Sequence, residues 1–467
     1  MRKSFKLIIV FFYFFVVGFA SLHSQNPIIA VRAYGGSNEL TPPVLLLKNN
    51  QKSVSPIGEE TVTIEMDVLT ENPPQLFIKF VHCNERWLET DNVIINSLGI
   101  FQTSAVDWTQ APGQSKYFRW RGKVQIPSAQ MQFPVSGNWL AKIYSLDNTE
   151  EVLSTVKIFV VEALIPSRTV MINDFYKPTS RFAASSAYNY EVVVDGTPRL
   201  LDFQLNTVAM YKMNWWNNPL YISLNNNEGK DEYTDEELYG DGESIDNTSP
   251  KNNPHRQQLS SSITDQGPFP MNISGFANVR KMFRVNNVPS VNEYRIFDCS
   301  NPGLFPFVEE GIQLPFRDLR RRNQFLEYAD DGFIVTSRVS QFADEYIRVE
   351  FVLDPEKLPV EKSVFVVGSF NNWTPTREWE MSFDNEREVY SLKQWIRRGR
   401  HSYLYGIGSL NFEKNNVEGL SFEEFEGNTI HSRQTMISFV YYRELQYGGY
   451  DAIISVSAVN SQGTFQR

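Results

Sequence analysis

The sequence predicts an all-β protein made of three β-sandwich-type modules in tandem. Phe, Tyr and Trp make up 14% of the 467 residues, which is typical of strand-rich proteins. Prolines and asparagines interrupt short runs in which apolar and polar residues alternate, and such alternation places successive side chains on opposite faces of a sheet. No long stretch repeats its apolar residues with the period of a helix. A chain of this length is sufficient for two to four domains, each with a hydrophobic core.

The first 24 residues predict a cleaved signal peptide. Three basic residues lie within the first six positions, residues 7–19 form an uninterrupted apolar run, and Ala20 and Ser24 offer small side chains for cleavage. A signal anchor is the alternative, but the apolar run is about half as long as a transmembrane helix requires. The new N-terminus would be Ser21 or Gln25, and because neither is a cysteine, no lipid anchor is expected. We expect an exported mature chain with no membrane insertion.

The charge of the mature chain excludes one class of partner. Loss of the three basic residues of the leader changes the net charge from -10 to -13. Because an acidic surface repels phosphate groups, nucleic acid is not an expected partner. The chain has only two cysteines, too few for a disulfide framework. Cys83 and Cys299 are either a single bridge or two buried thiols.

The strand pattern divides the mature chain into three expected modules. Residues 61–66, 76–81, 139–144 and 155–160 alternate as half-buried strands, and Pro166 follows the last of them. Further strands are expected at 190–194, 275–285 and 294–297, and later at 435–443 and 451–458. The expected division is an N-terminal β-sandwich over 25–166, a middle β domain over 167–345 and a C-terminal immunoglobulin-like β-sandwich over 346–467.

An acidic insertion is expected to interrupt the middle domain at residues 228–254. Nine acidic residues lie between Glu228 and Asp246, among Asn, Gly and Ser. A segment this polar buries too little apolar surface to offset the entropy lost on ordering, so we expect a mobile loop. Asp241, Glu243 and Asp246 are alternative calcium ligands, but their spacing differs from that of an EF-hand loop.

No motif for catalysis stands out, and neither a metal site nor a cofactor is expected. The four histidines of the mature chain are His82, His255, His401 and His431, and none lies four residues from another on an expected helix. Ser154 matches a Ser-x-x-Lys pattern, but it lies on an alternating strand rather than on a helix. No pair of carboxylates is singled out for glycoside hydrolysis. The sequence therefore favours a protein that is not an enzyme.

Five short strings, in order along the chain, resemble one bacterial family. They are residues 82–87, 136–139, 292–298, 368–373 and 440–443 with 450–451. Together they resemble the type IX secretion system plug proteins of Bacteroidetes-like bacteria. Residues 203–289 depart most from the pattern. Six residues serve as signatures of the fold rather than of a site, namely Trp87, Asn138, Trp139, Gly368, Asn371 and Asn372.

The resemblance implies a role in closing a pore. Plug proteins of this family lie at the periplasmic side of the outer membrane and close the inner mouth of the barrel through which type IX substrates pass. The expected partner is therefore that outer-membrane translocon barrel, with the protein a monomer outside the complex. Reversible docking favours a few arginine or aromatic anchors within a polar rim. The candidates are Arg317, Arg320, Arg321 and Arg322, in the one dense basic cluster, and Trp215 and Trp216; a solvated loop is the alternative for the arginines.

A second resemblance supports a different function for the C-terminal module. Residues 368–373, followed by residues 401–405, are also similar to glycogen-binding sandwiches, in which tryptophan faces stack on sugar rings. Trp373 would be the platform, with Trp379 and Trp395 as a second one. Leu404 occupies the position of a lysine that donates to sugar hydroxyls in those modules. Without that donor, stacking alone orients a sugar poorly. Secreted or periplasmic glycan binding is therefore the alternative function.

Overall fold

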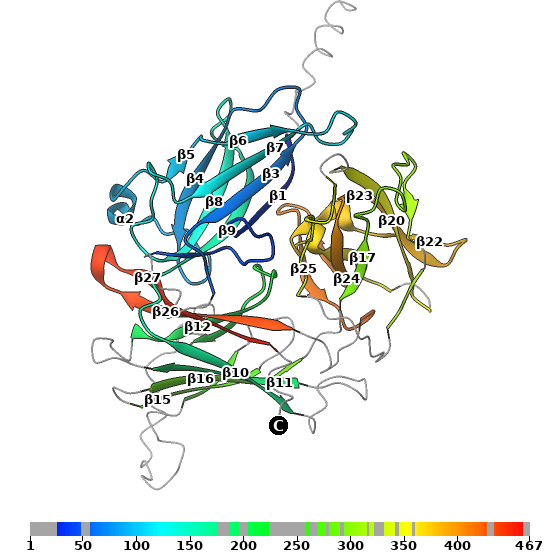
Figure 1. Ribbon diagram of the computed structural model, residues 1–467. Helices are drawn as coiled ribbons and strands as arrows, with labels where there is room; N and C mark the ends of the chain where they lie inside the picture. Colours follow the sequence, from blue (N-terminus) through cyan, green and yellow to red (C-terminus); the bar gives the residue numbers. More distant parts are fainter. Residues whose placement is uncertain are drawn as a thin grey trace, which may run out of the picture.

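The computed structural model confirms an all-β architecture built from several open sheets (Figure 1). The strands form five sheets among the residues that the structure describes. Those residues are 26–47, 57–174, 187–195, 204–223, 257–261, 269–276, 280–289, 294–314, 317–321, 331–340, 345–356, 360–426 and 434–460. The expected signal peptide and the acidic insertion lie outside them.

The N-terminal sandwich packs a four-stranded sheet against part of a nine-stranded sheet. The smaller sheet has the order β1-β3-β7-β6. Its inward side chains, such as Ile64 and Met66, share one core with Ile78 and Trp139 of the larger sheet. The strands of the smaller sheet are β1 (Ile28–Gly35), β3 (Val62–Val68), β6 (Asp107–Gln110) and β7 (Trp120–Ile126).

The nine-stranded sheet connects segments that are far apart in the sequence. Its order is β13-β12-β26-β27-β9-β8-β4-β5, with β2 paired to β9. The last hairpin of the chain lies next to β9 through a parallel pairing at Ile453 and Val161. The strands are β2 (Val44–Leu46), β4 (Leu76–Cys83), β5 (Gln102–Thr103), β8 (Gly137–Ser145), β9 (Val152–Val161), β12 (Thr207–Lys212), β13 (Leu220–Ser223), β26 (Thr435–Glu444) and β27 (Tyr450–Asn460).

A second sandwich forms on the other half of the nine-stranded sheet. A five-stranded sheet of order β10-β11-β16-β15-β14 lies below β12, β26 and β27 in Figure 1. Thr169 of β10 is hydrogen bonded at 2.8 Å to both Ser438 of β26 and Ser457 of β27. The strands are β10 (Ser167–Asp174), β11 (Ala187–Asp195), β14 (Gln257–Ser261), β15 (Phe269–Phe276) and β16 (Arg280–Pro289).

The C-terminal module is a separate sandwich of two sheets. One has the order β17-β24-β21 with β25 beside β24, and the other has the order β18-β20-β23-β22 with β19 beside β20. Phe351 and Tyr405 are fully buried in the core between them. The strands are β17 (Arg295–Asp298), β18 (Ile312–Gln313), β19 (Asp318–Leu319), β20 (Tyr346–Asp354), β21 (Ser363–Gly368), β22 (Ser382–Asp384), β23 (Val389–Arg397), β24 (Arg400–Asn411) and β25 (Asn416–Ser421).

The strand pairing crosses the module boundaries expected at residues 166 and 345. β26 and β27, expected in the C-terminal sandwich, pair with β12 and β9 instead. β17, expected in the middle domain, pairs with β24 of the C-terminal module. Alternation identifies a strand but carries no information about its partner, so a division made along the sequence misses both exchanges.

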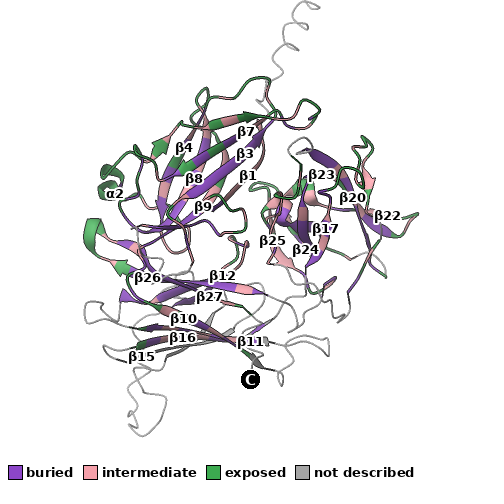
Figure 2. Ribbon diagram, in the orientation of Figure 1, coloured by how far each residue is buried: buried purple, intermediate pink, exposed green. Residues whose placement is uncertain are grey.

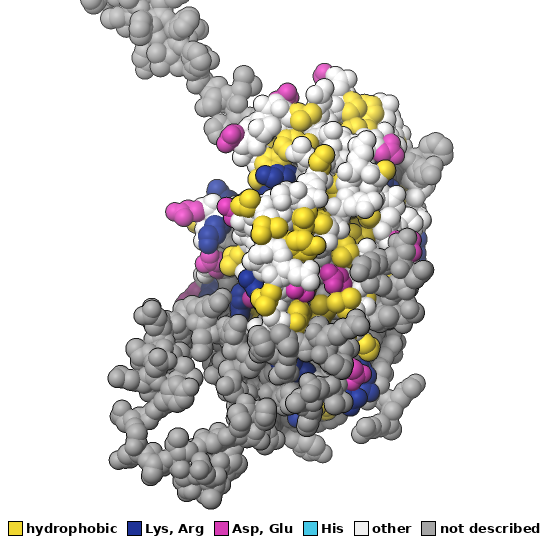
Figure 3. Space-filling view, turned by 90° about the vertical axis from the view of Figure 1, so that its left-hand side faces the viewer, with side chains coloured by type: hydrophobic (Ala, Val, Ile, Leu, Met, Phe, Trp, Pro, Cys, Tyr) yellow, Lys and Arg dark blue, Asp and Glu magenta, His cyan; other side chains and the backbone are white. Residues whose placement is uncertain are grey.

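One short α-helix lies among the described residues, on the β4–β5 connection. It is α2 (Val93–Ser97), and Asn92 caps it by accepting hydrogen bonds from the backbone N–H groups of Ile94 and Ile95. The 3-10 turn η8 (Gln446–Gly448), at the tip of the β26–β27 hairpin, lies against α2. Figure 2 shows α2 and the hairpin tip as mostly exposed, whereas much of the neighbouring strands β8, β26 and β27 is buried. Figure 3, which views the molecule from that side, shows hydrophobic side chains gathered on this face.

Candidate functional site

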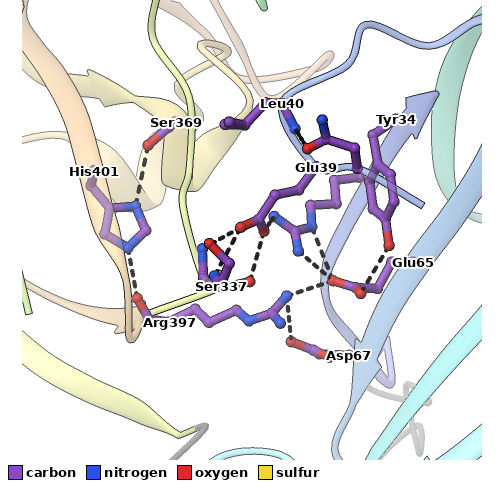
Figure 4. Close-up of polar contacts among 12 residues, drawn as sticks. Tyr34, Glu39, Leu40, Glu65, Asp67, Ser337, Ser369, Arg397 and His401 are labelled. Carbon is purple, nitrogen blue, oxygen red and sulfur yellow. Dashed lines mark hydrogen bonds and ion pairs between the residues drawn. The ribbon is translucent and has the colours of Figure 1, made fainter. Parts of the chain in front are cut away.

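A buried ionic junction joins the N-terminal sandwich to the C-terminal module. Glu65 and Asp67 alternate with core residues along β3, so their carboxylates point away from the N-terminal core. Arg397, the last residue of β23, reaches across from the C-terminal module. Its Nη1 donates to Glu65 Oε1 at 2.6 Å and lies 4.0 Å from Asp67 Oδ2 (Figure 4).

Each carboxylate of the junction has further partners. Arg32 Nη2 of β1 lies 2.8 Å from Glu65 Oε1, and the hydroxyl of Tyr34 donates to Glu65 Oε2 at 3.3 Å. Arg121 of β7 binds Asp67 with both Nε and Nη2, at 2.6 and 3.0 Å. Tyr346, which begins β20, donates to Asp67 Oδ2 at 2.8 Å. Thus Arg397 and Tyr346 both bind carboxylates of the N-terminal sandwich.

The junction keeps its charges at neutral pH. Burial alone would raise the carboxyl pKa values, because it disfavours the charged form. The guanidinium groups of Arg32, Arg397 and Arg121 outweigh that effect and hold the pKa of Glu65 well below its usual range. Arg121 and Arg397 likewise lower the pKa of Asp67. Burial and the neighbouring carboxylate of Glu65 raise the pKa of Tyr34 to about 12, so its hydroxyl stays a donor.

Loops on both sides of the junction add polar contacts. Glu39 accepts hydrogen bonds from the backbone N–H groups of Thr336 and Ser337, at 2.6 and 3.0 Å. The Ser115 hydroxyl donates to Glu345 at 3.1 Å. Because these contacts come from separate loops, they restrict rotation of one module against the other.

An aromatic cluster joins the C-terminal module to the nine-stranded sheet. Trp373 stacks on Trp215, which follows β12, with ring centroids 4.6 Å apart. Its indole N–H donates to the carbonyl oxygen of Gly332 at 3.1 Å. Gly332 has a φ of +76°, and a Cβ added there would lie 2.8 Å from the Trp373 ring. Glycine is therefore required at this position both by the backbone and by the approach of the indole.

Two hollows lie beside the junction. The larger has a volume of about 670 Å³ and is lined by Lys157, Trp216, Asn372 and Asn415, among others. The smaller has a volume of about 270 Å³ and is lined partly by Glu65, Trp395 and Arg397. The larger volume lies in the range of small-ligand pockets. Its polar lining combines side-chain amides with the charged groups of Arg32, Glu39, Lys157 and Lys414.

Comparison with known proteins assigns the N-terminal sandwich. Residues 31–162 match the family model described as type 9 secretion system plug protein 1st domain. The chain carries the first domain of the type IX secretion plug family. The match confirms the resemblance stated from residues 82–87 and 136–139. The carboxylates Glu65 and Asp67, and Arg32 and Arg121 that bind them, all lie inside this plug-family domain.

One solved structure supports the fold of nearly the whole chain. A crystal structure of a hypothetical protein from Parabacteroides merdae aligns with a TM-score of 0.69 at 18% identity. The alignment covers 94% of this chain and 98% of that one. At this identity the likeness concerns the fold alone. No curated protein matches the chain.

Two of the four arginines proposed as an exposed docking site are buried in the structure. Arg320 and Arg321 are 8% and 9% exposed. They lie 2.8 Å from Glu424 and 3.6 Å from Glu426 respectively. Arg317 is exposed, and Arg322 lies outside the described residues. The two glutamates follow about a hundred residues later, so no local pattern in the sequence indicates that they cover these arginines.

The two adjacent tryptophans, Trp215 and Trp216, are not both available to a partner. Trp215 is buried against Trp373, so it cannot anchor a partner without unpacking the cluster. Trp216 is half-buried, lines the larger hollow and packs edge-on against Phe159.

The tryptophans considered as sugar platforms are mostly engaged within the protein. Trp373 is 4% exposed and its ring face is covered by Trp215. Trp379 stacks on Phe370, and Trp395 stacks on Tyr117, each with centroids 4.7 Å apart. Trp379 and Trp395 are half-buried and line the smaller hollow.

The signature residues of the N-terminal domain have structural contacts. Trp139 is 1% exposed, and the indole N–H of Trp87 donates to the hydroxyl of Tyr211 at 2.8 Å. The side chain of Asn138 donates to the carbonyl oxygen of Asn84 and accepts from Tyr441 of β26. Asn138 therefore also ties the plug-family domain to the last hairpin.

The signature at residues 368–373 forms a closed turn. Asn371 Oδ1 accepts from the N–H of Gly368, and its Nδ2 donates to the carbonyl oxygen of Val366. Asn372, with a φ of +50°, donates to the carbonyl oxygen of Val31 in the N-terminal sandwich at 2.9 Å. The turn thus positions Trp373 and contributes a further contact between the modules.

His82 and His401 are buried, and burial lowers the pKa of each to about 4. Within the described ranges, no group of three or more His, Cys, Asp or Glu side chains could hold a metal ion. Over the same ranges, no helix is long and apolar enough to cross a membrane.

Cys83 and Cys299 are both buried and free, and they lie in different sandwiches. Burial raises the pKa of the Cys83 thiol to about 12 and that of Cys299 to about 11. We therefore expect neither thiol to react with a thiolate-specific reagent at pH 8 in the folded protein, and both to react in denaturant. Absorbance of released 2-nitro-5-thiobenzoate measures this. Fewer than two thiols in non-reducing denaturant would instead indicate a bridge.

The junction was not among the residues singled out from the sequence. Glu65 and Asp67 occupy the polar positions of an alternating strand, a pattern that ordinarily indicates a solvent-facing side. The Arg-Arg-Gly-Arg string at residues 397–400 was a usable signal, since clustered arginines are suited to binding buried carboxylates. No pattern near residues 397–400 indicates that Arg397 contacts β3, which lies more than 300 residues earlier in the sequence.

Proposed function

We propose that this protein is a non-enzymatic periplasmic plug that closes the periplasmic opening of the type IX translocon barrel while no substrate is passing. The observation that carries the proposal is the plug-family first domain at residues 31–162. The proposal includes an exported protein that lies in the periplasm, peripheral to the outer membrane. The translocon barrel would be its main partner.

The mechanical construction of the molecule suits such a role. A protein that closes a wide pore must keep its domains in a fixed arrangement while it is bound there. The N-terminal sandwich and the second sandwich share one nine-stranded sheet. The C-terminal module is attached to them through Arg397 and through the stacked pair of Trp215 and Trp373. Because Arg397 ends a strand of one sheet of the module and Trp373 follows a strand of the other sheet, both sheets are held and the body resists bending at this boundary. It would leave the mouth as a unit, displaced by cargo or by another subunit.

Deleting the gene is expected to make cells permeable to large antibiotics and dyes that the outer membrane normally excludes. Export of type IX cargo should continue, because the pore stays open without its stopper. The measurement is uptake of a large fluorescent dye, together with the amount of secreted cargo, in the deletion strain and in the same strain complemented with the wild-type gene.

Unchanged permeability in a strain with an assembled translocon would overturn the proposed function. A pull-down of the tagged protein from solubilised outer membranes distinguishes the alternatives. Capture of the barrel supports the plug. Recovery of polysaccharide-utilisation proteins would support glycan binding instead.

A further inference from the structure

The exposed apolar side chains of the described residues are concentrated in one place. Seventeen large hydrophobic residues are exposed among those that the structure describes. Seven of them lie close together, namely Leu88, four within residues 93–100, and Leu445 and Tyr447. Val93 is 72% exposed, and Ile100 and Leu445 are each 67% exposed. The α2–η8 patch is defined here as Val93, Ile94, Leu98, Ile100, Leu445 and Tyr447.

Two parts of the chain build this patch together. Asn92 Nδ2 donates to the carbonyl oxygens of Tyr447 and Gly449, at 2.8 and 3.3 Å. Ile94 lies close to the hairpin tip, since a Cβ added to Gly448 would be 3.3 Å from its Cδ1. The connection after β4 and the tip of this hairpin therefore form one surface, and Figure 3 shows several groups of hydrophobic side chains on this side of the molecule.

The residues beneath the α2–η8 patch are well packed. Ile95, the inward residue of α2, is fully buried in the main hydrophobic core, and Tyr450 beside the tip is 5% exposed. The two strands of the hairpin are paired up to Glu444 and Tyr450, directly beside the tip. The outward apolar side chains thus sit on a fixed support, as expected for a surface that a partner covers.

The charges around the patch restrict what that partner is. Residues 88–101 and 443–449 contain Glu89, Asp91 and Glu444 and one cation, Arg443. Asp451 pairs with Arg443 and Lys142 of β8 pairs with Glu89, so the remaining charges of these segments, Asp91 and Glu444, are both negative. An anionic lipid surface attracts basic segments, and this border supplies none that is uncompensated. Two copies pairing through the same face would bring the same carboxylates together. The border instead complements a protein surface with basic side chains around an apolar centre.

We propose that the α2–η8 patch is the face by which this protein docks on the translocon barrel, against an apolar surface bordered by Lys and Arg. This inference rests on the proposed function and assigns its contact surface. Apolar contacts at the centre supply the attraction, while the acidic border speeds encounter and sets orientation. Such an interface can be released, because it does not require unfolding of either partner.

The test compares two triple variants in capture of the solubilised translocon barrel. The first, Val93→Ser, Ile100→Ser and Leu445→Ser, removes the centre of the patch. The control, Leu304→Ser, Leu319→Ser and Phe412→Ser, removes apolar side chains of the C-terminal module that are 73%, 50% and 74% exposed. We expect the patch variant to lose at least tenfold in affinity and the control to bind as the wild-type protein does. Both should keep the wild-type melting temperature, because all six side chains are exposed.

Each other outcome has a definite meaning. Equal binding by the wild-type protein and the patch variant would overturn the docking face while leaving the plug role in place. No capture of the barrel by the wild-type protein would overturn the plug role, and the docking face with it. Flotation with phosphatidylglycerol vesicles, or sedimentation as a dimer, that the patch substitutions abolish would assign the patch to a membrane or to a second copy instead.

Discussion

Replacing Trp373 by alanine is expected to lower the free energy of unfolding by about 3–5 kcal/mol, the usual cost of deleting a buried aromatic ring. The indole is 4% exposed, stacks on Trp215 and donates to the carbonyl oxygen of Gly332. Its loss leaves a cavity between the C-terminal module and the segment after β12, and leaves that carbonyl without its indole donor. Urea denaturation followed by tryptophan fluorescence measures the change.

Two variants control this prediction. Trp373→Phe keeps most of the ring volume and loses only the indole N–H, so it should be less destabilising than Trp373→Ala. Trp379→Ala, on the next turn, removes a half-buried ring and should also cost less. A Trp373→Ala protein that keeps wild-type stability but no longer binds starch or glycogen would show that the indole is a sugar platform, contrary to its packing.

Arg397→Met is expected to destabilise the protein by about 3 kcal/mol, at the lower end of the cost of breaking a buried ion pair. Methionine retains much of the side-chain volume but removes the guanidinium that reaches Glu65 at 2.6 Å. Glu65 keeps Arg32 and Tyr34 as partners, which limits the loss. Because Arg397 belongs to the C-terminal module and Glu65 to the N-terminal sandwich, calorimetry should also show the modules melting less cooperatively.

The matched control for Arg397→Met is Arg443→Met. Arg443 pairs with Asp451 at 3.0 Å, but its side chain is 47% exposed. Exposed pairs contribute about 0–1 kcal/mol, so this variant should remain close to the wild-type protein. An equal decrease in the free energy of unfolding for the two variants would show that burial of the junction does not strengthen its ion pairs.

The dependence of the Arg397→Met effect on pH follows from the lowered pKa of Glu65. A carboxyl group whose pKa falls on folding stabilises the folded state above its ordinary pKa, 4.5 here, and loses that contribution as the pH falls. The difference in unfolding free energy between wild-type and variant should therefore be constant between pH 5 and pH 7. Because the unfolded state titrates alike in both proteins, the difference should stay constant below the ordinary pKa as well. It should shrink only when the pH falls through the folded-state pKa of Glu65 in the variant, which Arg32 and Arg121 still hold below the usual range. A difference that grows on acidification would contradict this assignment.

Local pattern was sufficient to predict the class of fold and many of its strands. Alternation at residues 76–81 and 139–144 corresponds to β4 and β8, and it correctly indicated that Trp139 faces a core. These features depend on neighbours within one strand, because a pleated backbone directs successive side chains to opposite faces. Strings of a few residues were likewise sufficient for the resemblance to the plug family.

Which strands pair, and which charges meet, was decided only by the tertiary structure. β27 lies beside β9, almost 300 residues earlier, and Arg397 binds Glu65 of β3. Arg320 and Arg321 had the composition of a surface cluster, yet Glu424 and Glu426 cover them. The polar face of a strand looks the same in sequence whether water or another module covers it. Its environment is set by long-range packing, which alternation along the chain does not encode.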